Sequence, residues 1–178
     1  RQKLMRTIGV YLIFAAVALR GAVVSNGAPQ FGAVLGFLAA YGLLLFAETW
    51  VIRQKNFGFH SNNLHLVYLL LQSSLVIGLL AVSSLEDFFA LLFIPLSLDA
   101  VSFFGRRLGF VIIAVLSIAL TGALLFSDEG RLFGLAMGGL YSGMCFLFGG
   151  YAHQVQKAEA AHEQNQRMFN ELQIAHHQ

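Results

Sequence analysis

Three ionisable side chains of this sequence stand inside stretches that are otherwise apolar. Asp99 lies in the run FIPLSLDAVSFFGRR, Arg20 lies in the first apolar stretch, and Glu48 lies near the end of the second. Charged groups in such surroundings are costly in a bilayer and commonly mark the sites of ions, protons or ligands. These three residues are therefore the candidates for sensing a ligand or another signal.

Pro95 stands four residues before Asp99. A proline inside a helix removes one hydrogen bond, here the bond to the carbonyl of Leu91, and tends to kink the helix. A kinked helix beside an acidic side chain suits an ion or ligand site, so Pro95 joins the candidates. The alternative for Asp99 is structural: the carboxyl group is protonated, or is hydrogen-bonded to a serine or to Gln72, and helps the helices to pack.

Arg20 and Glu48 also have structural explanations. The long side chain of Arg20 can reach the outer lipid headgroups, and Glu48 can reach the inner interface or pair with Arg53. The three charges are expected at different depths, which makes a continuous path for protons or ions a poor fit. The transporter hypothesis also requires internal repeats, and residues 1–82 show none with residues 88–151.

Neither a catalytic site nor a metal site is expected in these 178 residues. His60, His65 and His153 are predicted at one membrane face, but no HxxxH or CxxC spacing and no set of carboxylates accompanies them. The single cysteine, Cys145, can form no internal disulfide. The net charge of +2, without a basic block, argues against nucleic acid as a partner. No cofactor is expected in this region.

The composition places these residues in a membrane protein. Hydrophobic residues make up 57% of the chain and charged residues 11%, whereas soluble domains carry about 25% charged residues. Six stretches are long enough to cross a bilayer, which takes about 20 residues of helix. They are residues 7–24, 31–50, 64–82, 88–104, 108–126 and 132–151. The predicted fold is all-α, with a six-helix transmembrane domain over residues 1–151.

Lysine and arginine in the loops set the orientation of such a bundle. One side collects Arg1, Lys3, Arg6, Arg53, Lys55, Arg106, Arg107, Lys157 and Arg167; the other has Arg131 and the acids Glu86, Asp87, Asp128 and Glu129. Because the number of predicted spans is even, both termini lie on the basic, cytoplasmic side. We expect a multi-pass protein of the bacterial inner membrane, with the lipid bilayer around it.

Glycines four residues apart recur in the last predicted span, as Gly134-xxx-Gly138 and Gly139-xxx-Gly143. Small residues at this spacing let helices approach closely in lipid. Such pairs serve packing within one chain at least as often as contact between subunits. We expect a contact between subunits here because of the segment that follows the span.

Residues 152–178 are polar, contain neither Gly nor Pro, and consist mostly of good helix formers. A stripe at alternating steps of three and four residues predicts the seam of a coiled coil, whose polar members lower stability but fix the register. Its members are Val155, Ala158, His162, Asn165, Phe169, Leu172 and His176. We expect one helix to continue from the sixth span into the cytoplasm for about 40 Å. In a parallel homodimer, Val155, Ala158, Phe169 and Leu172 would face their symmetry mates.

Six spans with short loops, followed by QKAEAAHEQNQRMFNELQIAHHQ, resemble the membrane region and signalling helix of bacterial sensor histidine kinases. The similarity is to the class of nitrate and lipid-fluidity sensors, and it covers the tail and the general layout. It implies the input region of a two-component signalling protein, followed by a dimerisation helix with a phospho-accepting histidine and an ATPase domain. ATP and Mg²⁺ would be cofactors of that following region, and a response regulator its partner.

The chain departs from that family at the histidines of its tail. The family's phospho-acceptor stands next to an acidic residue, which His176-His177-Gln178 lacks, and His162-Glu163 lies too close to the membrane. No phosphorylated residue is therefore assigned. A diguanylate cyclase is an alternative output. The second hypothesis is a non-enzymatic integral subunit or scaffold of a larger membrane complex, and the third is a small transporter or channel.

Overall fold

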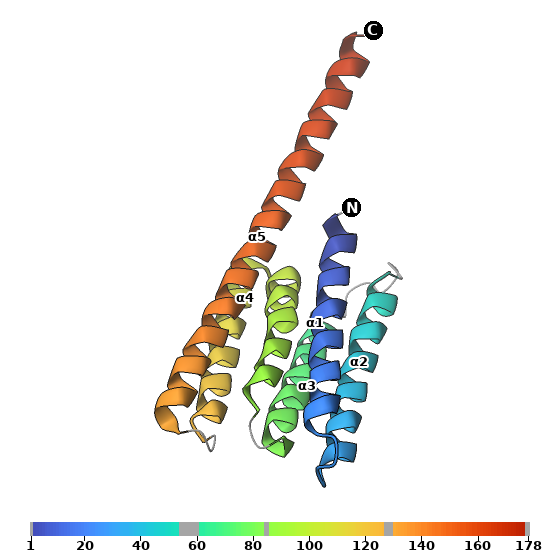
Figure 1. The fold of residues 1–178 in the computed structure, drawn as a ribbon. Helices are drawn as coiled ribbons and strands as arrows, with labels where there is room; N and C mark the ends of the chain where they lie inside the picture. Colours follow the sequence, from blue (N-terminus) through green and yellow to red (C-terminus); the bar gives the residue numbers. More distant parts are fainter. Residues whose placement is uncertain (1, 54–60, 84–85, 127–129, 177–178) are drawn as a thin grey trace.

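The computed structural model describes residues 2–53, 61–83, 86–126 and 130–176 (Figure 1). Several residues named above lie outside these ranges: Arg1, Lys55, His60, Asp128, Glu129, His177 and Gln178. All regular structure within the ranges is helical. The order is α1 (Gln2–Val24), α2 (Phe31–Arg53), α3 (Ser61–Val82), the 3₁₀ helix η1 (Asp87–Leu92), α4 (Phe93–Leu124) and α5 (Arg131–His176). The prediction of an all-α fold is confirmed.

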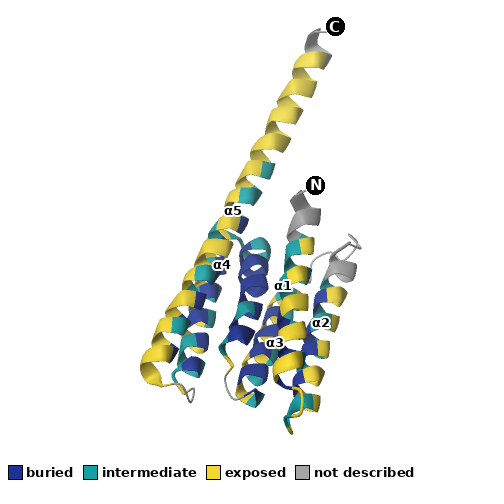
Figure 2. Cartoon of the chain, viewed as in Figure 1, coloured by how far each residue is buried: buried dark blue, intermediate teal, exposed yellow. Residues whose placement is uncertain are grey.

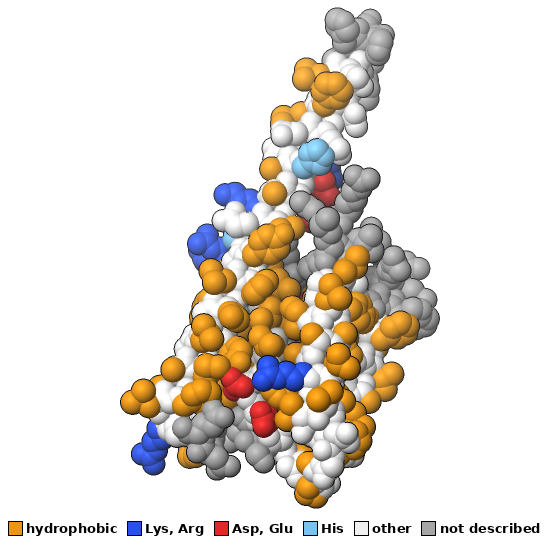
Figure 3. Space-filling view, in the orientation of Figure 1, with side chains coloured by type: hydrophobic (Ala, Val, Ile, Leu, Met, Phe, Trp, Pro, Cys, Tyr) orange, Lys and Arg blue, Asp and Glu red, His pale blue; other side chains and the backbone are white. Residues whose placement is uncertain are grey.

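Five helical segments of the described chain are long and apolar enough to cross a membrane. They are Thr7–Val24, Phe31–Glu48, Asn63–Val82, Asp87–Leu124 and Arg131–Gln173. Their outward faces carry large apolar side chains, seen as orange surface in Figure 3. Leu19, Ile118 and Leu147 are at least 70% exposed. Side chains of this kind are suited to lipid, and their number on one surface indicates a membrane protein.

The fourth of these segments is divided by a reversal at Gly105. This glycine has φ 73° and ψ −174°, a conformation that residues with a Cβ rarely adopt. A Cβ built on Gly109 would lie 2.7 Å from the Cα of Val101, whereas eight residues of straight helix span about 12 Å. The arms 93–104 and 106–124 therefore run in opposite directions and pack together (Figure 1). The reversal lies at the turn that the GRR sequence predicted.

Residues 87–104, which we call the central segment, occupy the middle of the bundle. From Phe88 to Val101 each residue is buried except Leu91, which is partly buried (Figure 2). The central segment contacts α1, α3, the second arm of α4 and α5. A helix that is apolar on all sides is buried by neighbours on all sides. Residues 88–96, FFALLFIPL, are apolar throughout.

Pro95 lies in the first turn of α4, directly after η1. At this position a proline interrupts no helical hydrogen bond, because the first N–H groups of a helix have no partner within it. The kink predicted between Pro95 and Asp99 is absent: within α4 the structure has non-helical backbone angles at Gly105. The proline instead marks the change from 3₁₀ to α-helix.

α5 is one continuous helix of 46 residues. Its first half packs along the second arm of α4, and its second half projects from the bundle (Figures 1 and 2). From residue 160 to residue 173 every side chain is exposed. The unbroken helix that was predicted from the lack of Gly and Pro is confirmed. Its pairing with a second copy stays a prediction.

Candidate functional site

Asp99 lies on the first arm of α4, with 3% of its surface exposed. Two tyrosines from neighbouring helices surround it. Its carboxyl group is close enough to interact electrostatically with the hydroxyl groups of Tyr41, on α2, and Tyr68, on α3. The two hydroxyl groups donate their hydrogen bonds elsewhere, Tyr41 to the carbonyl of Leu92 and Tyr68 to Glu48. The structure therefore places Asp99 at the meeting point of three helices.

Glu48 belongs to the same site. The hydroxyl of Tyr68 donates a hydrogen bond of 2.8 Å to Oε2 of Glu48. Glu48 thus lies toward α3, and the alternative pairing with Arg53 falls on a side chain outside the described part of the structure. Both carboxyl groups, Glu48 and Asp99, interact electrostatically with the Tyr68 hydroxyl. Of the three charged residues found in the sequence, Glu48 is hydrogen-bonded to Tyr68, and Asp99 is near enough to affect the same hydroxyl electrostatically.

Gln72 extends this site one helical turn along α3. It is fully buried, and its Nε2 donates a hydrogen bond of 3.5 Å to the backbone carbonyl of Tyr41. The Tyr41 hydroxyl donates in turn to the carbonyl of Leu92, at 2.9 Å. Gln72 Oε1 has no hydrogen-bond partner in the structure. We refer to Tyr41, Glu48, Tyr68, Gln72 and Asp99 together as the polar cluster.

Aromatic rings cover the polar cluster on the side of the Gly105 reversal. The ring of His65 stacks on Phe103 with a centroid distance of 4.1 Å, and Tyr68 meets the same ring edge-on at 6.3 Å. This stack gives His65 a packing role. Within the described ranges, no three His, Cys, Asp or Glu side chains come together in a way that could hold a metal.

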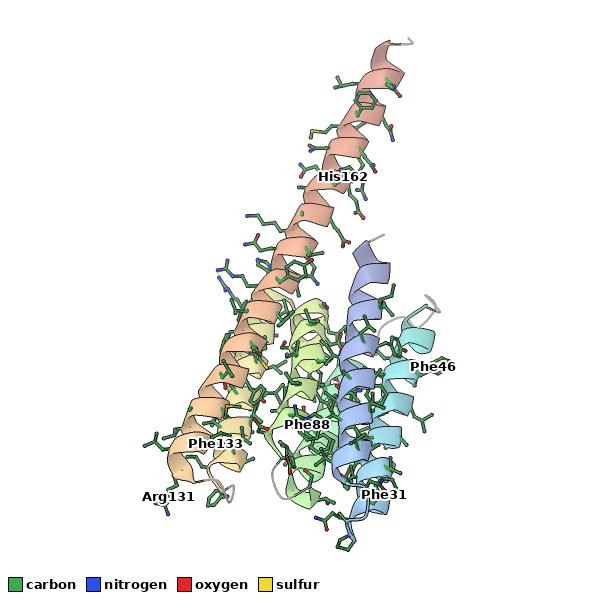
Figure 4. The ribbon with its side chains drawn as sticks, viewed as in Figure 1. Phe31, Phe46, Phe88, Arg131, Phe133 and His162 are labelled. Carbon is green, nitrogen blue, oxygen red and sulfur yellow. The ribbon has the colours of Figure 1, made fainter. Side chains whose placement is uncertain are left out.

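Arg20 belongs to a second group of side chains, together with Asp87, Phe88 and Tyr141, which we call the arginine group. Its guanidinium carbon is 4.5 Å from the ring centroid of Phe88, a cation–π geometry. Beside it, Tyr141 of α5 donates a hydrogen bond of 3.1 Å to Oδ2 of Asp87. Arg20 also interacts electrostatically with Tyr141. Figure 3 shows basic and acidic side chains adjoining at this level, and Figure 4 shows Phe88 between α1 and α5.

Asp87 and Asp99 are twelve residues apart on the central segment, or about 18 Å for an α-helix. The arginine group is therefore separate from the polar cluster. Arg20 is exposed and lies over the ring of Phe88; its contact with lipid headgroups stays a prediction.

The two glycine pairs of α5 have different surroundings. A Cβ added at Gly138 would lie 2.8 Å from the side chain of Thr121, and one added at Gly134 would collide with the backbone around Leu124. The same atom added at Gly139 or Gly143 would meet nothing within 4 Å. The first pair packs within the chain. The second is open, and its contact with another subunit stays a prediction.

No family model, curated protein or solved structure matches this chain.

Sequence reasoning missed the three tyrosines of these two sites: Tyr41, Tyr68 and Tyr141. A tyrosine hydroxyl in a buried place usually needs a hydrogen-bond partner. The sequence contains one indication of their role: each of the three tyrosines stands within an apolar stretch. Their partners could not be read from the sequence, since all three hydrogen bonds join different helices.

Proposed function

We propose that this chain is the transmembrane input region of a two-component-type signalling protein, in which α5 passes a membrane-proximal signal to a cytoplasmic output domain. The observation that carries the proposal is α5 itself. One half is packed against α4 by glycines, and the other half continues the same helix as an exposed rod. A rigid helix of this kind transmits a shift or rotation along its whole length.

The central segment links the polar cluster to this rod. It carries Asp99, and it is joined to α5 at both ends. Tyr141 donates to Asp87 near the start of the segment, and Gln156 Nε2 donates to the carbonyl of Ser102 at 3.4 Å near its end. A change in the surroundings of Asp99 that displaces the central segment therefore acts on α5. Signalling requires two arrangements of similar energy that the signal stabilises differently.

We place six crossings in the bilayer: α1, α2, α3, the central segment, the second arm of α4 and the first half of α5. The reversal at Gly105 supports two crossings within residues 87–124, since the second arm is about 28 Å long and the hydrocarbon core about 30 Å thick. Both termini are at one end of the molecule in Figure 1. Arg106, Arg107 and Lys157, all exposed, favour the cytoplasm for that end, in a bacterial inner membrane.

In this proposal, the exposed half of α5 forms a coiled coil with the same part of a second copy of the chain. Phe169 and Leu172 are 62% and 70% exposed, and a single helix in water gains nothing from apolar side chains in that position. A parallel coiled coil buries them together with Val155 and Ala158. Within the bilayer, the open pair Gly139 and Gly143 allows the two copies of α5 to approach.

A histidine kinase as the output domain is proposed only because the tail and the layout resemble those of sensor histidine kinases. ATP and Mg²⁺ would serve that following region, with a response regulator as its partner. The same exposed apolar residues, Phe169 and Leu172, also favour a second candidate function. In that case the chain is a non-enzymatic subunit of a larger membrane complex, and its tail pairs with a coiled coil of another protein.

Insertions directly after Tyr151 test the proposal in the full-length protein. One inserted residue turns the tail by about 100° relative to the bundle, whereas seven residues return the seam nearly to its original direction. We expect the first insertion to change the output strongly and the second to restore most of it. If both insertions leave the output unchanged, the tail is a tether and the signalling proposal fails.

Cysteine crosslinking distinguishes the two candidate partners of the tail. After Cys145→Ala, single cysteines at positions 155 and 172 should crosslink between copies in membranes. A cysteine at position 173, on another face of the helix, is the matched control. Equal crosslinking at all three positions, or none, would favour the integral-subunit alternative.

A further inference from the structure

The reversal at Gly105 places two arginines at the end of the bundle from which α5 projects. Arg106 and Arg107 follow the glycine directly, and both are exposed. Gln156 of α5 donates a hydrogen bond to the carbonyl of Ser102, so the reversal and this part of α5 lie at the same level. Figure 3 shows lysine and arginine side chains close together beside the base of the projecting half of α5.

An aromatic stack fixes how the second arm of α4 meets α5 below the reversal. Phe110 and Phe146 have ring centroids 6.1 Å apart and an angle of 15° between their planes. Arg107 and Arg106 precede Phe110 by three and four residues, so these side chains share one side of the second arm. The arginines therefore lie about one helical turn from the stack, on the side where the second arm meets α5.

The corresponding stripe of α5 carries two polar side chains and one open position. Gly150, His153 and Lys157 follow Phe146 by four, seven and eleven residues, which is the spacing of a single helix face. Because Gly150 and Arg106 each stand four residues from the stacked rings, they lie at about the same level. A Cβ added at Gly150 would meet nothing within 4 Å. Open space therefore adjoins Gly150 beside the arginines, with His153 and Lys157 farther along the same face.

No acidic side chain balances these positive charges. Within the described ranges, neither of the two arginines nor Lys157 forms an ion pair. Glu159 is the acid of α5 closest to Lys157 in sequence, and two residues of separation place it on another face of the helix. The adjoining outer surface is apolar (Figure 3) and includes Leu108 and Leu147, which are 60% and 74% exposed. A positively charged surface next to an apolar one is complementary to a molecule with an anionic head and apolar chains.

We propose that Arg106, Arg107, His153 and Lys157, which we call the basic corner, bind the phosphate group of an anionic phospholipid beside Gly150. Arginine and lysine donate charge-assisted hydrogen bonds to phosphate oxygens, and basic pockets between membrane helices bind anionic headgroups in other proteins. The acyl chains lie along the outer surface of the second arm and α5. The lipid thus connects the reversal to the base of the tail. This binding is independent of any output domain; in the proposed sensor, it makes the position of α5 sensitive to anionic lipid.

Native mass spectrometry of the full-length protein, released from bilayers of phosphatidylcholine and phosphatidylglycerol, tests the inference. We expect phosphatidylglycerol to be retained with about ten-fold higher affinity than phosphatidylcholine. The double variant Arg106→Gln with Arg107→Gln should lose this preference. The double variant Arg131→Gln with Arg167→Gln removes the same charge from exposed positions elsewhere on the chain. It is the matched control and should keep the preference.

Gly150→Leu distinguishes a defined site from a general attraction between charges. It fills the open position and leaves the charge unchanged, and its Cβ meets no neighbour, so the protein should fold while phosphatidylglycerol binding weakens. The inference is overturned if the parent retains both lipids equally, or if the control double variant loses the preference as fully as the arginine pair. It is also overturned if Gly150→Leu binds phosphatidylglycerol as tightly as the parent. Displacement of the lipid by free glycerol phosphate would overturn it too, because the site would then recognise a soluble phosphate.

Discussion

The Tyr141 hydroxyl of α5 donates a hydrogen bond of 3.1 Å to the Asp87 carboxylate of η1, across 54 positions of sequence. This bond joins the start of the central segment to the helix that leaves the bundle. Arg20 of α1 lies beside it, over the ring of Phe88. Three helices that are distant in sequence therefore meet at one hydrogen bond.

Tyr141→Phe removes this hydrogen bond and keeps the ring. We expect the free energy of unfolding to fall by about 1–3 kcal/mol, because the Asp87 carboxyl group loses a hydrogen-bond donor. In the proposed sensor, we also expect the output to change. Thermal unfolding and autophosphorylation measure the two effects. Tyr151→Phe is the matched control, because Tyr151 is 64% exposed. If the two variants behave alike, the bond contributes neither to stability nor to signalling.

In the proposed sensor, Asp99→Asn is expected to change the signalling response more than the amount of folded protein. The substitution keeps the size and the capacity for hydrogen bonds but removes the ionisable carboxyl group near Tyr41 and Tyr68. Size-exclusion chromatography measures folding, and a phosphorylation assay measures the response. Glu163→Gln, on the exposed tail, controls for loss of one charge. Loss of folded protein with a normal response in the remainder would assign Asp99 a structural role.

Gly138 and Gly139 form a matched pair on neighbouring faces of α5. Gly138→Leu must displace Thr121, so we expect it to lower the free energy of unfolding by about 1–3 kcal/mol. Gly139→Leu meets open space, and the single chain should fold normally. It should instead reduce crosslinking between copies if this face is the dimer contact. Equal stability of the two variants would contradict the packing of α5 on α4.

Gly105→Ala tests the reversal of α4. With φ at 73° and ψ at −174°, an alanine is strained by about 1–3 kcal/mol, and thermal unfolding should detect the loss. Gly122→Ala is the control, because a Cβ there would meet nothing within 4 Å and Gly122 lies inside the same helix. That variant should be unchanged or up to about 1 kcal/mol more stable. A straight helix through residue 105 would tolerate both alanines.

Local features of the sequence predict the all-α fold and some of its turns. Length, composition and the positions of glycine, proline and charge are local properties. They predicted an all-α chain, a turn at the GRR sequence and an uninterrupted helix after residue 150. The structure confirms the all-α fold, the turn and the continuity of α5, and it has five helical segments that could cross a membrane.

Which helix faces pack together could not be predicted from these local features. In the folded chain Glu48 is hydrogen-bonded to Tyr68, and Arg20 lies over Phe88 in a separate group. Gly138 faces Thr121 of α4, whereas Gly139 faces open space. The central segment lies in the middle of the bundle, and Pro95 lies in the first turn of α4, where it does not kink the helix. The physical reason is that these helices are apolar on every side, so no periodic pattern marks an inner face. In lipid, shape and a few polar contacts select the neighbours instead.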